Sequence, residues 1–105
     1  LTITSMTVLD FTDWQKDISF SGIEHRLFIE GRGFDFRTFE ISHLSNAKLE
    51  LNGPEDPLYG LLDFEEPRVI YVVSRLGKKE LILQGCIITE IDGDKCFLSY
   101  SKLQL

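Results

Sequence analysis

The stretch RVIYVVSRLGKKELILQGCIITEIDGDKCFLSYSKL, at residues 68–103, decides the fold class of this chain. It is rich in Val, Ile, Leu and Tyr, and two short polar segments divide it, at residues 77–79 and 92–93. Side chains branched at Cβ and aromatic side chains favour strands, whereas Gly-containing polar segments favour tight turns. The pattern therefore predicts three consecutive antiparallel strands, over residues 68–76, 80–91 and 95–103, with a kink at Gly85 in the second.

The register of the last hairpin determines how the two cysteines lie. A two-residue turn at Asp92-Gly93 pairs Glu90 with Lys95 and directs Cys86 and Cys96 to opposite faces of the sheet. A three-residue loop places both cysteines on one face, but about 13 Å apart along the strands. Neither register permits a disulfide, so we expect reduced thiols and a cytoplasmic protein. In the two-residue register, one face carries the expected core residues Ile87, Ile91, Cys96, Leu98 and Tyr100.

The remainder of the chain also has mainly the pattern of strands. Residues 3–9 predict a first strand, and Asp10 is placed to cap a short helix with Phe11, Trp14 and Ile18 on one side. Residues 25–30 and 34–41 predict a hairpin with a turn at Gly31-Arg32-Gly33. The apolar alternation shifts inside 34–41, which indicates a bulge near Arg37-Thr38 or burial on both faces. Residues 47–52 alternate cleanly, with Leu49 and Leu51 directed inward.

These elements predict one mainly β domain spanning residues 1–105. About seven strands and one or two short helices are expected, arranged as an antiparallel β sandwich or a small, partly open β barrel. The hydrophobic fraction of 43% is enough for a core without disulfides or metals. The longest apolar run is far too short for a membrane helix, so no membrane association is expected.

The charge of the chain is concentrated in one third of its length. The net charge is −6, and residues 35–66 contain eight acidic and two basic residues, so this window accounts for the whole imbalance. Proteins that bind nucleic acids usually present clustered Lys and Arg, so direct nucleic-acid binding and an anionic membrane are disfavoured as partners. A basic protein partner is compatible with this charge.

The segment NGPEDPLYGLLDFEEP, at residues 52–67, is the strongest candidate for a binding site. It contains all three prolines of the chain, and apolar side chains lie among acids that have no Lys or Arg between them. Aromatic anchors inside an acidic rim suit a protein–protein interface. The alternative is a short helix capped by Asp56, over 58–64, whose apolar side closes the end of the sheet. The predicted partner-binding residues are Glu55, Asp56, Tyr59, Asp63, Phe64, Glu65 and Glu66.

Motifs for catalysis, phosphate binding or metal binding are missing from the sequence. There is no Walker loop, no G-x-G-x-x-G, no G-x-S-x-G, no H-E-x-x-H and no C-x-x-C. Two histidines, His25 and His43, are available for acid–base chemistry, but nothing in the sequence brings them together. The spacings among Cys86, Cys96 and the histidines do not match a zinc site. We therefore expect no enzyme activity, no metal and no cofactor.

The profile favours a small acidic inhibitor, such as a bacterial immunity protein that neutralises a basic toxin nuclease by occluding its active site. Carboxylates of residues 55–66 would pair with Lys and Arg of the toxin, and Tyr59 and Phe64 would supply buried anchors. The alternatives are an assembly subunit that self-associates through an exposed edge strand at 47–52 or 95–103, and a barrel that encloses a small apolar ligand.

Overall fold

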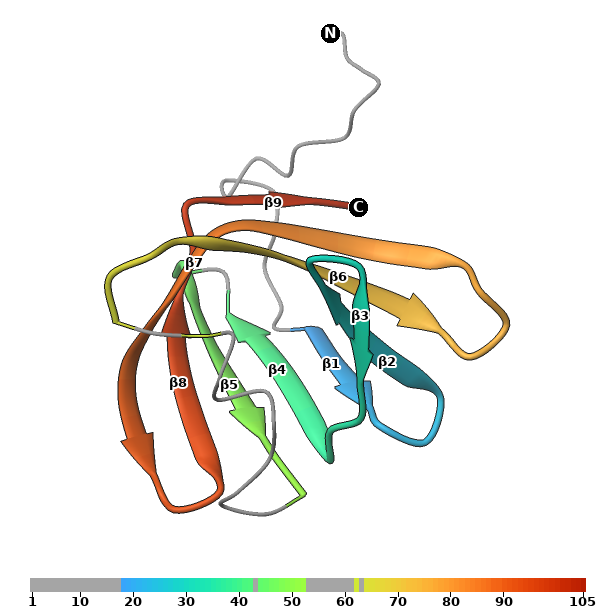
Figure 1. The fold of residues 1–105 in the computed structure, drawn as a ribbon, viewed down its shortest axis with the longest axis horizontal. Helices are drawn as coiled ribbons and strands as arrows, with labels where there is room; N and C mark the ends of the chain where they lie inside the picture. Colours follow the sequence, from blue (N-terminus) through green and yellow to red (C-terminus); the bar gives the residue numbers. More distant parts are fainter. Residues whose placement is uncertain (1–17, 43, 53–61, 63) are drawn as a thin grey trace, which may run out of the picture.

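The structure is a computed structural model that describes residues 18–42, 44–52, 62 and 64–105. Every regular element among these residues is a β-strand, and none is a helix (Figure 1). The strands are β1 (Ile18–Ser21), β2 (His25–Ile29), β3 (Arg32–Phe34), β4 (Thr38–Ser42), β5 (Asn46–Glu50), β6 (Arg68–Ser74), β7 (Lys79–Asp92), β8 (Lys95–Ser99) and β9 (Lys102–Gln104).

The nine strands form one antiparallel sheet. Its order is β1-β4-β5-β8-β7-β6-β2-β3, and β9 pairs with β7. The sheet does not close, because β1 and β3 stand at the two ends of this order. The mainly antiparallel β architecture predicted from the sequence is confirmed, with nine strands among the described residues where about seven were expected for the whole chain.

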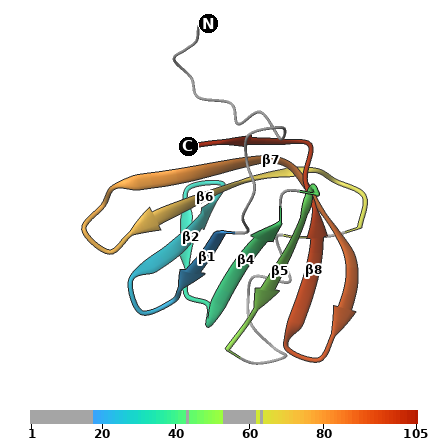
Figure 2. The ribbon, with the colours of Figure 1, turned by 180° about the vertical axis from the view of Figure 1, so that it is seen from behind.

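The long strand β7 belongs to both halves of the sheet. Its first part pairs with β6 and β9, and its last part pairs with β8. Between them Gly85 has a φ of +71°, and the buried positions change from Leu81 and Leu83 before it to Cys86 and Ile88 after it. A glycine with positive φ inserts an extra residue and bends the strand. The kink predicted at Gly85 is therefore confirmed, and Figure 2 shows β7 passing from one half to the other.

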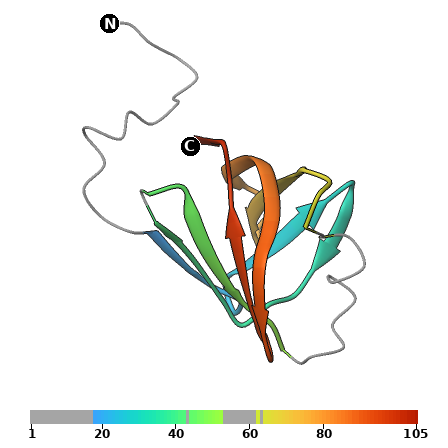
Figure 3. The same cartoon turned by 90° about the vertical axis from the view of Figure 1, so that its left-hand side faces the viewer.

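The bend divides the sheet into two half-sheets that enclose the core. The first half-sheet contains β2, β3, β6, β9 and the start of β7, and the second contains β1, β4, β5, β8 and the end of β7. Figure 3 shows the two halves diverging from the region of β7 and β8. Apolar side chains of both inner faces form a single buried cluster, which includes Leu27, Ile29, Phe39, Leu49, Ile70, Leu83 and Leu98.

The predicted strand over 34–41 is wrong, because the chain leaves one half-sheet and enters the other within it. Strand β3 ends at Phe34, and β4 starts at Thr38 and pairs with β1 and β5. The shift in alternation therefore marks a crossing between half-sheets. Even-numbered Phe34 faces inward before the crossing, and odd-numbered Phe39 and Ile41 face inward after it. Gly22 lies against this crossing and donates a backbone hydrogen bond to the carbonyl of Arg37, at 3.0 Å.

The predicted hairpin turns that follow β2 and β7 are both displaced by a residue or more. The β2–β3 turn is Glu30-Gly31, with φ values of +54° and +80°, which is the pattern of a type I′ turn. The β7–β8 turn is Gly93-Asp94, so that Asp92 pairs with Lys95 and Ile91 with Cys96. Gly93, with φ +66°, occupies the first central position, where a type II′ turn requires glycine.

A bulge in β7 corrects the expected placement of the cysteines. Cys86 and Cys96 are both buried in the core cluster, and neither forms a disulfide. The prediction of opposite faces is wrong, because the bulge between Ile88 and Glu90 changes which alternate residues of β7 face inward, and it lies between Cys86 and the residue paired with Cys96. The expected core face is only partly right. Cys96, Leu98 and Tyr100 are buried, and because of the same bulge Ile88 takes the buried position expected for Ile87. Ile91 pairs with Cys96 as a residue of that face, but it lies near the end of the hairpin and is exposed.

Several other expectations have definite outcomes. The alternation over 47–52 is confirmed, because Leu49 and Leu51 are fully buried. The segment 47–52 is not an edge of the sheet, and neither is the part of 95–103 that forms β8, since β5 and β8 each lie between two strands. The end of 95–103 belongs to β9, which pairs with β7 alone among the described strands and is an edge. Ile18, expected at the end of a helix, starts β1. The rest of that helix, the strand over 3–9, His43 and most of the helix over 58–64 lie outside the described residues.

Candidate functional site

The predicted binding segment is described only at its C-terminal end. Glu55, Asp56, Tyr59 and Asp63 lie outside the described residues. Leu62 is buried in the core cluster, as the alternative of an apolar plug requires of this residue. The three predicted site residues that follow, Phe64, Glu65 and Glu66, are all exposed, and 55% of Phe64 is accessible to solvent. An aromatic ring and two carboxylates are therefore presented together at the entry to β6.

The acidity of this end is moderated by Arg68, the first residue of β6. Its guanidinium lies 3.4 Å from a carboxylate oxygen of Glu66 and also pairs with Glu30 at the β2–β3 turn. Arg68 is mostly buried, with 21% of its side chain exposed. It therefore fixes Glu66 beside the end of the first half-sheet, and it neutralises part of the charge that the sequence assigned to the site.

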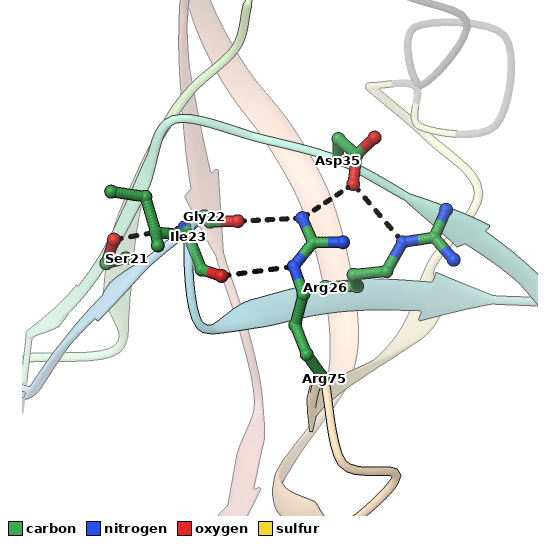
Figure 4. A network of polar contacts seen from close by, with 6 residues as sticks. All are labelled: Ser21, Gly22, Ile23, Arg26, Asp35 and Arg75. Carbon is green, nitrogen blue, oxygen red and sulfur yellow. Dashed lines mark hydrogen bonds and ion pairs between the residues drawn. The ribbon is translucent and has the colours of Figure 1, made fainter.

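A network around Arg75 organises the opposite end of the first half-sheet (Figure 4). Arg75 follows β6 and donates hydrogen bonds to the carbonyls of Gly22, at 2.8 Å, and Ile23, at 3.2 Å. It also donates to Asp35 at 2.9 Å, and Arg26 donates to the same carboxylate oxygen at 3.2 Å. One arginine therefore ties the turn after β6 to the β1–β2 turn and to the crossing after β3.

The two arginines change the electrostatics of Asp35. The hydrogen bond from Arg75 is the main cause that lowers the pKa of Asp35 below its ordinary value of 3.8, and the charge of Arg26 adds to it. The carboxylate is thus held ionised between two cations. The trio carries a net charge of +1 at neutral pH.

Two aliphatic side chains project from the turns that Arg75 ties together. Ile23 is 85% exposed and Leu76 is 98% exposed. Both line a hollow of about 380 Å³, which also includes His25 and Glu80. Nε2 of His25 lies 3.2 Å from a carboxylate oxygen of Glu80, and the ring of Phe20 stands edge-on at 4.8 Å. This end is therefore a second exposed apolar surface on a fixed framework.

A third surface, which sequence reasoning missed, is the outer face of the first half-sheet. Phe28 of β2 stands directly opposite Tyr71 of β6. The guanidinium of Arg26 lies 5.7 Å from the centroid of the Phe28 ring, and Nζ of Lys79 lies 4.7 Å from the centroid of the Tyr71 ring. The alternation of Val69, Tyr71 and Val73 on the outer side of β6 was a signal that this face is unusually apolar.

Nucleophilic and metal-binding groups are sparse in the part of the chain that the structure describes. Burial raises the pKa of Cys86 to about 12 and that of Cys96 to about 11, so both thiols are protonated at neutral pH. No group of three or more His, Cys, Asp or Glu side chains among the described residues is arranged to hold a metal ion. Within the same residues, no helix is long and apolar enough to span a membrane.

Comparison of this chain with protein-family models, with curated proteins and with solved structures gave no match. The functional argument therefore rests on the surfaces just described.

Proposed function

We propose that this chain is a non-catalytic protein-binding domain that inhibits a basic partner by covering its functional site. The observation that supports this proposal best is the exposed triplet Phe64-Glu65-Glu66 at the entry to β6. A half-exposed aromatic ring next to carboxylates can be buried in a partner while the acids pair with cations around it. Arg68 fixes Glu66 in place before binding, which reduces the entropy lost on association.

The partner proposed is a basic protein, and specifically a toxin nuclease whose cleft carries Lys and Arg for its anionic substrate. Residues 35–66 hold the entire net charge of −6, and five of the eight acids in this window lie at positions 55–66, so the segment that ends in the triplet has an acidic field of its own. Such a field accelerates encounter with a basic cleft and loses strength as salt is raised. Two reduced, buried cysteines suit a cytoplasmic setting for this inhibitor.

The test is a capture experiment with a matched pair of variants. The first variant combines Phe64→Ala, Glu65→Gln and Glu66→Gln. The control combines Glu90→Gln, Ile91→Ala and Asp92→Asn, because Glu90-Ile91-Asp92 likewise contains one exposed apolar residue and two exposed acids, but at the end of β7. The immobilised proteins are incubated with a lysate of the source cell and washed with rising salt. The wild-type and control proteins are expected to retain a basic nuclease that elutes with salt, and the first variant is expected not to retain it.

The captured nuclease is then titrated with the soluble chain in a cleavage assay. Inhibition that is complete at a ratio of one to one supports the proposal. Equal capture by the first variant and the control contradicts the assignment of the triplet, and capture of a nuclease that remains fully active contradicts inhibition.

A further inference from the structure

The outer face of the first half-sheet has a composition of its own. Residues paired across neighbouring strands point to the same side of a sheet. Three rows of such pairs cross this face, from Gly33 to Gln104, from Arg26 to Lys79, and from Gln84 to Lys102. The members of these rows, called here the aromatic face, are Arg26, Phe28, Gly33, Tyr71, Val73, Lys79, Ile82, Gln84, Lys102 and Gln104.

The aromatic face carries three cations and no acid, although the chain has a net charge of −6. The corresponding face of the second half-sheet is different. There Phe97 stands between Lys48 and Glu90, and the same or the adjacent row holds Glu40, Glu50, Asp92 and Lys95, so four acids and two lysines surround this ring. The acids nearest the rim of the aromatic face are already paired, Asp35 with Arg26 and Arg75 and Glu30 with Arg68. Positive charge is therefore the local character of this face.

The two rings of the aromatic face are neighbours and accessible along one hollow. Phe28, Tyr71, Val73 and Lys79 line a hollow of about 410 Å³ together with Gly31 and Gly77 of the two adjacent hairpin turns. A Cβ atom on Gly33 would lie 3.0 Å from Cζ of Phe28 and 2.9 Å from Nη1 of Arg26. Both side chains therefore extend across the glycine of β3, where any larger residue would displace them.

We propose that the aromatic face binds single-stranded nucleic acid. Bases would stack on Phe28 and Tyr71, and phosphates would pair with Lys79, Lys102 and the Nη atoms of Arg26, whose Nε donates to Asp35. An acidic peptide would satisfy the cations but leave the rings uncovered, and an apolar partner would bury the cations without a counter-charge. A single strand offers planar rings and anions in alternation, which matches rings and cations in adjacent positions. The proposal concerns a different face from the Phe64 triplet and does not rest on the proposed inhibitor function.

This proposal revises the expectation that net charge excludes nucleic acid. The net charge averages over the whole chain, whereas residues outside 35–66 have equal numbers of acids and bases. Salt at physiological strength screens exposed charges beyond about 8 Å, so a local cluster of cations determines contacts made at the face. Three phosphate contacts give a dependence of log K on log salt with a slope of about −2 for a single strand.

The experiment uses the full chain and a fluorescein-labelled oligothymidylate of about ten nucleotides, with binding measured by anisotropy at several salt concentrations. Phe28→Ala and Tyr71→Ala are each expected to weaken binding by roughly fivefold to 150-fold, the range of one lost base–aromatic stack. Phe97→Ala is the matched control, because Phe97 also lies on an outer face but with acids beside it. It is expected to leave the affinity unchanged. Lys79→Gln and Lys102→Gln together should reduce the salt slope by about 1.4.

Folding of each variant is checked by its denaturation midpoint, and Phe28→Leu and Tyr71→Leu replace the alanine variants if these are unstable. The leucine variants keep apolar area but lose the stacking ring, so they too should weaken binding. The proposal is overturned if an abasic oligonucleotide or polyglutamate binds as tightly as oligothymidylate, because the rings would then have no role. Equal weakening by Phe97→Ala, or no measurable binding at low salt, would overturn it as well.

Discussion

Replacing Gly85 by alanine tests whether the bend in β7 holds the two half-sheets together. Gly85 has a φ of +71°, which costs an L-residue about 1–2 kcal/mol. An added Cβ would also lie 2.2 Å from Oγ and 3.0 Å from Cβ of Ser101, at the turn into β9. Ser101 would have to move, and its side-chain hydrogen bond to the carbonyl of Gln84, at 3.1 Å, would be lost. That loss contributes about 1 kcal/mol, and residual crowding about 1 kcal/mol more.

The expected decrease in the free energy of unfolding is therefore about 3–4 kcal/mol, measured by urea denaturation followed by circular dichroism. Gly93→Ala is the matched control, because Gly93 has a nearly equal φ of +66° and no atom within 4 Å of an added Cβ. It should cost only the backbone term of about 1–2 kcal/mol. The double variant Gly85→Ala, Ser101→Gly should lose less stability than the two single variants combined. Equal costs for Gly85→Ala and Gly93→Ala would refute the reasoning, because the contact with Ser101 would then contribute nothing.

Three further predictions concern other parts of the structure. Gly22→Ala should lower the free energy of unfolding by more than about 3 kcal/mol, because its Cβ would lie 1.7 Å from the backbone carbonyl oxygen of Phe36 and a backbone atom cannot rotate away; a urea midpoint equal to that of Gly31→Ala, which adds no contact within 4 Å, would contradict this. Both thiols should resist Ellman's reagent at pH 8 in the folded protein, because burial raises the pKa of Cys86 to about 12 and that of Cys96 to about 11, and they should react together once urea unfolds the chain; rapid reaction of one thiol without urea would show that its strand opens locally. Asp35→Asn should lower the free energy of unfolding by less than about 1 kcal/mol at pH 7, since the ion pairs of Asp35 with Arg26 and Arg75 are exposed to solvent. Because folding lowers the pKa of Asp35, the wild-type advantage should be present above pH 3.8 and disappear as the pH falls below it, as measured by urea midpoints of both proteins across that range.

Strands could be predicted from the sequence where one face is buried and the other is exposed, because apolar and polar residues then alternate. Leu49 and Leu51 alternate with polar residues because β5 lies in the interior of the order and has one buried face. The bend at Gly85 could also be predicted, since a glycine inside an apolar strand often lies at a bulge or a tight bend. The crossing at residues 35–37 could not be predicted, because Phe34 and Phe39 both face the core but from different half-sheets. Local alternation carries no information about which sheet a strand joins.

Some of the candidate surfaces could be predicted from the sequence, and others could not. Phe64, Glu65 and Glu66 were predictable because contiguous residues make that surface. The aromatic face was not, because Phe28 and Tyr71 become neighbours only through the pairing of β2 with β6. The position of Arg75 was equally hidden, since its four hydrogen bonds reach Gly22, Ile23, Glu24 and Asp35, all distant in the sequence.

One strand builds both outer faces, and this follows from the bend at Gly85. Before the bend, β7 contributes Lys79 and Ile82 to the aromatic face, and after it Glu90 and Asp92 to the acidic face of the second half-sheet. The other described residues with positive φ lie in turns, so Gly85 alone among them combines a left-handed backbone with a position inside a strand. The bulge between Ile88 and Glu90 is the second requirement, because it returns Glu90 and Asp92 to the outer side after the shift at Gly85. The different composition of the two outer faces therefore depends on the bend at Gly85 together with this bulge.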